Sequence, residues 1–441
     1  MVAEKNIIVA FEFGSSAIRG IVGKKEADGS IHILAIEQEK ISDSIRRGTV
    51  YNINKTTSAI SRIKERLNES LGIYITRAYV GIAGQSLHTT SNKVCRTFDN
   101  KVKVTQEMID ELMDENSRLQ YSDRQILDVE PQEYHLGIDT TTDPIGIQAD
   151  RIEGHYMNIV ARTVLQENIR YCMHEVGIDI VELLITPLEL AKALLPDTEK
   201  RSGCALVDIG AETTTVAIFT KNILRHLVTI PLGGKNVTND LAKLKNLEIE
   251  EAESLKIKYG TALLAQDKEN NTRQLSISND RTISEEEIQI ITSARYAEIV
   301  ANVCNQISKG QWENDLLSGI TLTGGAANAN GLTEAFMNMK NFSDNKIKIA
   351  KQLLTTLQSA SSVNSGEKGF NSAIALLMSA TENCIGTAPI FEEEVVETPA
   401  VAEEPVVEET EQEEEEEKPK KKNSLFGRFG GFLKKMVEED E

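Results

Sequence analysis

Cysteine is scarce in this chain, with five residues among 441 and no Cys-x-x-Cys pair. The odd number and the wide spacing disfavour a disulfide framework or a zinc site and are typical of a reducing cytosol. No second set of ligands accompanies His135 and His155 in the sequence, so we interpret both histidines as structural. The five cysteines are Cys95, Cys172, Cys204, Cys304 and Cys384.

Long apolar runs are absent as well. No stretch of about 20 apolar residues occurs, so the sequence predicts no helix that spans a bilayer. Residues 1–13 lack the basic start and the long apolar core of a signal peptide, and we interpret them as leading into a first strand.

Positive charge is in deficit, with a formal net charge of −20, which argues against nucleic acid as a main partner. Residues 392–417 hold fourteen Glu and no Lys, Arg or Asp, so the rest of the chain carries −20 + 14 = −6. Repelling charges with little apolar surface predict an extended, disordered linker over residues 386–422.

The length predicts two or more domains, and the globular part contains two similar openings. Each has an apolar strand that ends in a carboxylate and a glycine turn, followed by two more strands. We interpret this as a duplicated nucleotide-binding fold with a cleft between two related halves. The predicted strands are 7–11, 18–22, 31–36 and 78–82 in the first half and 205–210, 214–219 and 223–228 in the second, with a helix over 56–71.

Two glycine turns carry the predicted phosphate chemistry. The first phosphate turn follows Glu12 and the second follows Asp208. Backbone N–H groups in such turns can hold phosphate oxygens, and each carboxylate can hold hydrated Mg²⁺. Either turn alone is also explained as a plain hairpin; the pair at matching points of the repeat is more specific. The predicted phosphate residues are Gly14, Ser15, Ser16, Gly210, Thr213 and Thr214.

Three further motifs complete the candidate site. Small residues after the apolar run at 320–322 can let a base or ribose lie on the backbone, or can form an ordinary strand-to-helix turn: Gly324, Gly325 and Ala326. Gly233 and Gly234 form a second glycine pair. Glu253 and Lys256 share a helix face, where a solvated ion pair is the alternative.

The order of these motifs is that of the superfamily of actin, sugar kinases and chaperone ATPases, and the chain resembles the FtsA family of bacterial cell-division actins. Further stretches of the sequence also resemble the FtsA family. They are Ser44 with residues 46–50, the Pro-Gln-Glu-Tyr block at 131–134, and residues 143–146 and 151–155. The acidic linker that ends in a basic amphipathic tail adds to this resemblance.

This resemblance implies an α/β fold of the duplicated actin-like (ribonuclease H-like) ATPase type, with ATP and Mg²⁺ as cofactors and Glu12 and Asp208 at the metal. It implies a first lobe, 1A (1–83, 166–200, 366–385), an FtsA-type inserted subdomain, 1C (84–165), a second lobe, 2A (201–236, 309–365), and subdomain 2B (237–308), before the linker (386–422) and tail (423–441).

The resemblance also implies partners and a location. Subdomain 2B would receive the C-terminal peptide of FtsZ, the tubulin-like ring protein, at Arg281, Arg295 and Glu298. The protein would form an actin-like polymer with itself and meet other divisome proteins. It would lie peripherally on the cytoplasmic side of the inner membrane, at the division site.

The sequence departs from the family pattern at the phosphate turns. Glu12 stands where Asp is frequent, and Ala211 and Glu212 stand where two glycines are frequent. Thr186, before Pro187, takes the place of the glutamate that positions water in chaperone relatives, and Thr is no general base near neutral pH. We therefore expect nucleotide binding with slow hydrolysis.

The tail from 423 to 441 reads as a membrane-targeting amphipathic helix. Apolar residues fall on one helical face and basic residues largely elsewhere, which is typical of a helix in the interface of an anionic membrane. A helix that docks on the protein's own body or on a partner is the alternative. The predicted membrane residues are Leu425, Phe426, Arg428, Phe429, Phe432, Leu433, Lys434, Lys435 and Met436.

Other functions stay open at the level of sequence. A sugar kinase needs a carboxylate base beside a sugar pocket, and none is evident. A chaperone ATPase needs a β-rich substrate domain, whereas only the linker and tail follow the globular part. A pilus-assembly ATPase of the same superfamily is the remaining alternative.

Overall fold

A computed structural model describes residues 7–26, 28–264, 273–277, 281–340, 342, 346–350, 353–354, 357–359 (backbone only) and 369–386. The chain divides into two units, Met1–Ala388 and Pro389–Glu441. The second unit, with the predicted membrane residues and nearly all of the predicted linker, lies outside the described residues.

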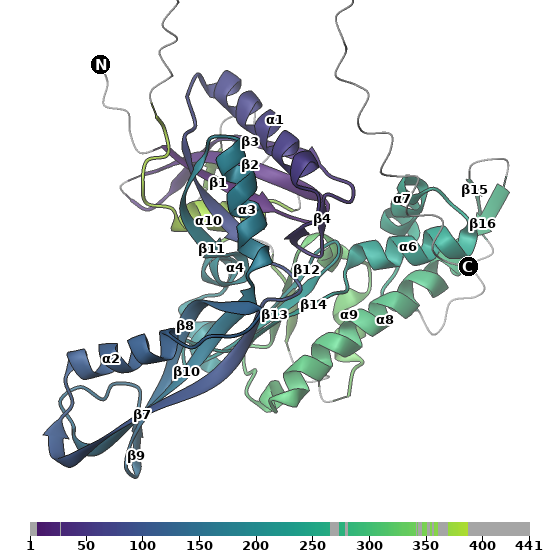
Figure 1. The fold of residues 1–441 in the computed structure, drawn as a ribbon. Helices are drawn as coiled ribbons and strands as arrows, with labels where there is room; N and C mark the ends of the chain where they lie inside the picture. The colour runs from purple at the N-terminus through teal and green to yellow at the C-terminus, as the bar shows by residue number, and fades with distance from the viewer. Residues whose placement is uncertain are drawn as a thin grey trace, which may run out of the picture. The chain divides into compact units, whose positions relative to one another are not determined.

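The first half is built on a six-stranded sheet in the order β11-β6-β1-β2-β3-β19 (Figure 1). Neighbours β1, β2 and β3 are antiparallel, whereas β6 and β11 continue the sheet in parallel. The strands are β1 (Ile7–Phe13), β2 (Ala17–Lys25), β3 (Ile31–Lys40), β6 (Arg77–Ile82), β11 (Asp179–Ile185) and β19 (Leu357–Ser359).

Helices cover this sheet, and the longest begins earlier than the sequence predicted. Asn52 has an extended backbone, and its side chain accepts a hydrogen bond from the Lys55 N–H at 3.0 Å, so α1 starts at Ile53 rather than at Thr56. It ends at Gly72, whose φ of 63° suits glycine. The helices are α1 (Ile53–Leu71), α3 (Val164–Glu175), α4 (Thr186–Leu194) and α10 (Asn371–Ser379). The short helix α5 (Asp197–Ser202) follows α4 but contacts strand β13 (Thr214–Thr220) of the second half.

The second half repeats the strand pattern of the first. Strands β12, β13 and β14 are antiparallel, and β17 and β18 continue in parallel on the β12 side. The predicted duplication is therefore confirmed at the level of topology. The strands are β12 (Cys204–Ile209), β13 (Thr214–Thr220), β14 (Ile223–Ile230), β17 (Ile320–Thr323) and β18 (Ile347–Ile349).

A four-stranded extension, here called the inserted sheet, joins β14 through the pairing of Val228 with His88. Helix α2 (Gln106–Ser117) packs along it (Figure 1). The apolar face of this sheet buries Val94, Tyr134 and Tyr156 against α2 in a core of its own. Its strands are β7 (His88–Lys103), β10 (Gln148–Arg162), β8 (Arg124–Leu136) and β9 (Asp139–Thr141).

The structure places acidic neighbours beside His135 and His155 that the sequence did not indicate. Strands β8 and β10 pair the two histidines with Glu153 and Glu133. The nineteen residues of chain between the two histidines hide this pairing in the sequence.

The remaining helices belong to the second half. The long α8 begins with a capping box in which Ser284 and Glu287 bond each other's backbone N–H groups. Trp312, for which the sequence indicated no role, stacks on His226 with ring centroids 5.0 Å apart and packs against the core. The elements are α6 (Gly234–Lys245), α7 (Ile249–Tyr259), α8 (Glu285–Lys309), α9 (Leu332–Met337), strands β15 (Gln274–Ile277) and β16 (Arg281–Ser284), and the 3₁₀ turns η1 (Trp312–Asn314) and η2 (Gly325–Asn328).

Within the described residues, no helix is long and apolar enough to cross a membrane. The five cysteines are all described, and none of them forms a disulfide; Cys95 is exposed and the other four are buried.

Candidate functional site

The first phosphate turn closes the β1–β2 hairpin. The Gly14 N–H donates to the Ala17 carbonyl at 3.1 Å, and the Ser15 hydroxyl accepts from the Gly48 N–H at 2.9 Å. Gly48 lies in the small hairpin of β4 (Ile45–Arg46) and β5 (Thr49–Val50). Ser16 is exposed next to Ser15. The turn is thus held from two sides, with a hydroxyl-bearing residue left at its surface.

Glu12 carries an ion pair that the sequence analysis missed. Arg19, on the neighbouring strand, donates from Nη1 to Glu12 Oε2 at 2.7 Å, and both side chains are largely buried. The pair lies directly opposite in the β1–β2 register. Counting residues along this hairpin from its turn would have found Arg19, because facing positions share one side of a sheet.

The second phosphate turn has the same local structure. The Gly210 N–H donates to the Thr213 carbonyl at 2.8 Å, and the Thr214 hydroxyl donates to the Leu232 carbonyl at 2.8 Å. Gly234, at the start of α6, donates its N–H to the Gly210 carbonyl at 2.9 Å. A Cβ on Gly233 would lie 2.6 Å from that carbonyl oxygen, so this close approach requires glycine.

The structure brings the two carboxylates at the strand ends into electrostatic contact. Desolvation by the surrounding protein raises the pKa of Asp208 to about 6. The negative charge of Glu12 raises this pKa further, and the positive charge of Arg19 lowers it. Gly324 lies against the same carboxylate, since a Cβ there would be 2.4 Å from Asp208 Oδ1. Residues from both halves and from the motif after β17 therefore meet at one place.

The motif at Gly324 continues this cluster toward α6. Gly325 and Ala326 belong to η2, and a Cβ on Gly234 would lie 2.9 Å from the Ala326 methyl group. The 3₁₀ turn η2 thus packs beside the N-terminus of α6.

Helix α7 contributes the predicted Glu253 and Lys256, which form a salt bridge of 2.7 Å. The interpretation as a solvated pair fits only Glu253, because the Lys256 side chain is 10% exposed. Lys256 also donates to the Thr238 hydroxyl at 3.0 Å and to the Gly234 carbonyl at 3.3 Å. The ammonium group is therefore fixed beside the glycine pair that begins α6.

A contact between the halves involves Glu212, one of the departures from the family pattern. Its carboxylate accepts from the Arg47 N–H at 2.7 Å and forms a salt bridge with Lys235 at 2.8 Å. The β4–β5 hairpin thus touches both phosphate turns, through Gly48 on Ser15 and through Arg47 on Glu212. The sequence indicated the hairpin only as a family likeness, since its partners lie far along the chain.

The predicted partner residues lie along α6. Arg281 donates to the carbonyls of Lys245 and Asn246 at 3.3 and 3.1 Å, at the C-terminal end of that helix. Arg295, on α8, binds Asp240 of α6 at 2.6 Å and also pairs with Glu298. Both arginines are therefore held by contacts within the protein.

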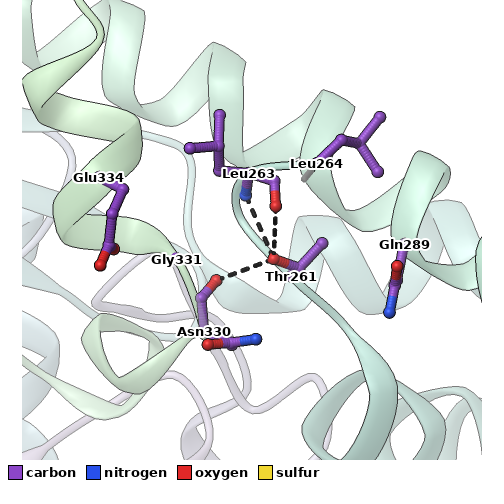
Figure 2. A pocket seen from close by; sticks show the side chains of 7 residues that line it. All are labelled: Thr261, Leu263, Leu264, Gln289, Asn330, Gly331 and Glu334. Carbon is purple, nitrogen blue, oxygen red and sulfur yellow. Dashed lines mark hydrogen bonds between the residues drawn. The ribbon is translucent and has the colours of Figure 1, made fainter. Parts of the chain in front are cut away.

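A small pocket has none of the predicted site residues in its lining (Figure 2). Thr261 and Gly331 form its centre, where the Thr261 hydroxyl bonds the carbonyls of Leu263 and Asn330 at 2.8 and 3.2 Å. Its volume is about 190 Å³. The lining residues are Thr261, Leu263, Leu264, Gln289, Asn330, Gly331 and Glu334.

Comparison with known proteins decides the family. The model of "Cell division protein FtsA" matches residues 205–375, and that of the "SHS2 domain inserted in FTSA" matches residues 84–160. Cell division protein FtsA of Porphyromonas gingivalis is 31% identical over 336 residues, which cover 75% of this chain and 70% of the relative. The chain belongs to the FtsA family. FtsA of Pseudomonas aeruginosa is 28% identical, over 74% of this chain and 79% of the relative.

The fold is accordingly the duplicated actin-like ATPase fold with the inserted FtsA-type subdomain, as predicted. A solved "PilM-PilN type IV pilus biogenesis complex" shares it, with a TM-score of 0.57 and 14% identity over 84% of this chain and 97% of that one. That likeness concerns the fold alone. The family assignment makes this a cell division protein and does not favour the chaperone or pilus-assembly alternatives.

Proposed function

We propose that this FtsA-family protein binds ATP with Mg²⁺ between its two halves and links an FtsZ ring to the membrane through its C-terminal tail. The observation that carries the nucleotide part is the meeting of Glu12 and Asp208 at the ends of equivalent strands, β1 and β12. Two neighbouring carboxylates repel each other when both are charged, and a divalent cation bound between them stabilises both charges.

The donor set fits such a cation and the phosphates that it would accompany. Glu12 and Asp208 supply hard oxygen ligands, which Mg²⁺ prefers, usually through water. Around them, the turns at Gly14 and Gly210 offer N–H groups and hydroxyls, and the lack of a Cβ at Gly324 and Gly234 lets the backbone pack closely against Asp208 and Ala326. Arg19 adds positive charge beside Glu12, and Lys256 adds it beside Gly234.

We also propose the subdomain boundaries that the sequence predicted, with 1C at 84–165 and 2B at 237–308. Separate cores support them: one within the inserted sheet and α2, and one among α6, α7, α8 and the β15–β16 hairpin. Self-association as an actin-like polymer and contact with other divisome proteins belong to the same proposal and rest on family membership.

The FtsZ peptide would dock on 2B beside Arg295. Arg295→Glu should weaken binding of a synthetic FtsZ C-terminal peptide by about tenfold or more, because it removes a charge-assisted hydrogen-bond donor and sets a second carboxylate against Asp240. Isothermal titration calorimetry would measure the affinity of the protein for the peptide.

Lys309→Glu is the matched control, since it makes the same charge change on α8, 14 residues or about 21 Å further along the helix. It should leave the affinity unchanged. Asp240→Asn separates a binding role from a structural one: it frees Arg295 and should preserve peptide binding. Equal affinities for Arg295→Glu and the unmodified protein would refute the docking site.

The tail would hold the protein on anionic lipid. Deletion of residues 423–441 should lower the fraction that sediments with anionic vesicles by about tenfold or more, because the deletion removes the apolar face and its basic flank. Phe432→Asp in the full chain should have a similar effect without shortening the tail. Vesicles of neutral lipid provide the control, and equal sedimentation of full and shortened chains would contradict the anchor.

A further inference from the structure

A second group of chemically active side chains lies on the inserted sheet. In the β8–β10 register, His135 faces Glu153 and His155 faces Glu133. Alternate residues of a strand point to the same face, so these four side chains form a two-by-two block on one face of the sheet. The intervening Tyr134 points to the other face, into the core with α2.

The distances within this block bring three donor atoms together. Glu133 Oε1 lies 3.1 Å from His135 Nε2 and 4.0 Å from His155 Nδ1. The two imidazole rings stack with centroids 4.0 Å apart. Among the described residues, Glu133, His135 and His155 form a group whose donor atoms all lie within 4.8 Å of one another.

The fourth member fixes the tautomer of His155. Glu153 Oε1 accepts a hydrogen bond from His155 Nε2 at 2.8 Å. An ionised carboxylate only accepts hydrogen bonds, and Arg151 Nη2 donates a second one to this group at 2.8 Å. The proton of neutral His155 therefore resides on Nε2, and Nδ1 presents its lone pair toward Glu133. A carboxylate behind the remote ring nitrogen is the usual support of a metal-binding histidine.

We propose that His135, His155 and Glu133 bind one divalent transition-metal ion of the Zn²⁺ or Co²⁺ class. Glu153 would orient His155 by accepting the hydrogen bond from its other ring nitrogen. Two imidazoles favour such ions over Mg²⁺ and Ca²⁺. Tetrahedral bonds of about 2.0–2.2 Å set donor atoms about 3.3 Å apart, between the 3.1 and 4.0 Å observed.

To aim its lone pair at a shared ion rather than at Glu133 Oε1, the imidazole of His135 has to turn. Its side chain is 36% exposed, and the χ2 torsion of histidine is broad. His155, at 17% exposure, keeps its place through Glu153. Three protein ligands leave a fourth position for water, and the bound ion would tie β8 to β10.

The test is a Co²⁺ titration of the full chain, followed by visible absorption, with excess Mg²⁺ present to occupy the acidic linker. Cys95 is exposed and faces Glu153 from β7, so all proteins carry Cys95→Ser to exclude thiolate ligation. One equivalent of Co²⁺ should bind, and Zn²⁺ should displace it.

The variants give the decisive comparison. His135→Ala and His155→Gln should weaken Co²⁺ binding by at least about tenfold, and Glu153→Gln should weaken it by about 10- to 100-fold. His174→Ala, which removes an exposed histidine of α3, should change nothing. Circular dichroism checks that each variant is folded. Two results would show that the block is only a hydrogen-bond network. One is equal Co²⁺ affinity in His155→Gln and its parent, and the other is no Co²⁺ binding by the parent in the presence of excess Mg²⁺.

Discussion

Asp208→Asn is expected to weaken Mg·ATP binding by about 10- to 100-fold. The carboxylate interacts with Glu12 and lies against Gly324, and Asp208 is the penultimate residue of strand β12, just before the second phosphate turn. Removing one charged partner of a metal–phosphate site costs about 1.5–3 kcal/mol, which corresponds to this loss of affinity. Titration with a fluorescent ATP analogue measures it.

The same substitution should not destabilise the protein without nucleotide. Asn has nearly the shape of Asp, and it removes both the cost of burying a charge and the repulsion from Glu12. The melting temperature should therefore stay equal or rise while affinity falls. Asp197→Asn, at a carboxylate 79% exposed on α5, is the matched control and should alter neither quantity. A fall in affinity together with a fall in melting temperature would point to a structural role for Asp208.

Leu376→Ala is expected to destabilise the first half by about 3 kcal/mol. Leu376 is fully buried on α10, which packs on β1, β2, β6 and α4. Its side chain fills the space above Gly81, where a Cβ would lie 2.4 Å from Leu376 Cδ1. Truncation of a buried leucine to alanine costs about 2–5 kcal/mol because a cavity remains. Denaturant unfolding, with hydrogen exchange of β1 and β6, measures the loss.

A double-substitution cycle makes the Leu376 prediction specific. Gly81→Ala alone should destabilise by overpacking, at about 1–3 kcal/mol, but in the Leu376→Ala background its methyl group enters the vacated space and should cost less. Leu317→Ala, at a side chain 71% exposed, should stay within about 0.5 kcal/mol of the unmodified protein. Additive effects of Gly81→Ala and Leu376→Ala would contradict the packing described.

The sequence predicted those parts of the fold that depend on local pattern. The apolar run at 7–11 predicts β1, and the runs at 18–22 and 31–36 predict the β2–β3 hairpin, all without tertiary information. The ends of elements were harder to predict, because single side chains determine them. The hydrogen bond of Asn52 places the start of α1 three residues before the predicted position. Periodicity reports the buried face of a helix, whereas a cap depends on one polar atom.

The candidate site was predictable where a motif is contiguous and not where strands bring distant residues together. Glu12 and Asp208 end apolar strands and are visible in the sequence. Lys235 and Glu212 meet only because α6 starts against the second turn, and the β4–β5 hairpin reaches both turns from elsewhere in the chain. The block of His135 and His155 arises from β8–β10 register, which no composition or spacing reveals.

The central claim is that one nucleotide lies between equivalent strand ends of the two halves. A crystal structure of the protein with Mn²⁺ and a non-hydrolysable ATP analogue tests it directly, because Mn²⁺ gives an anomalous signal. We predict the metal peak beside the carboxylates of Glu12 and Asp208, with the phosphates on the turns at Gly14 and Gly210. A nucleotide seated instead in the pocket at Thr261 and Gly331, with the metal away from both carboxylates, would contradict the account.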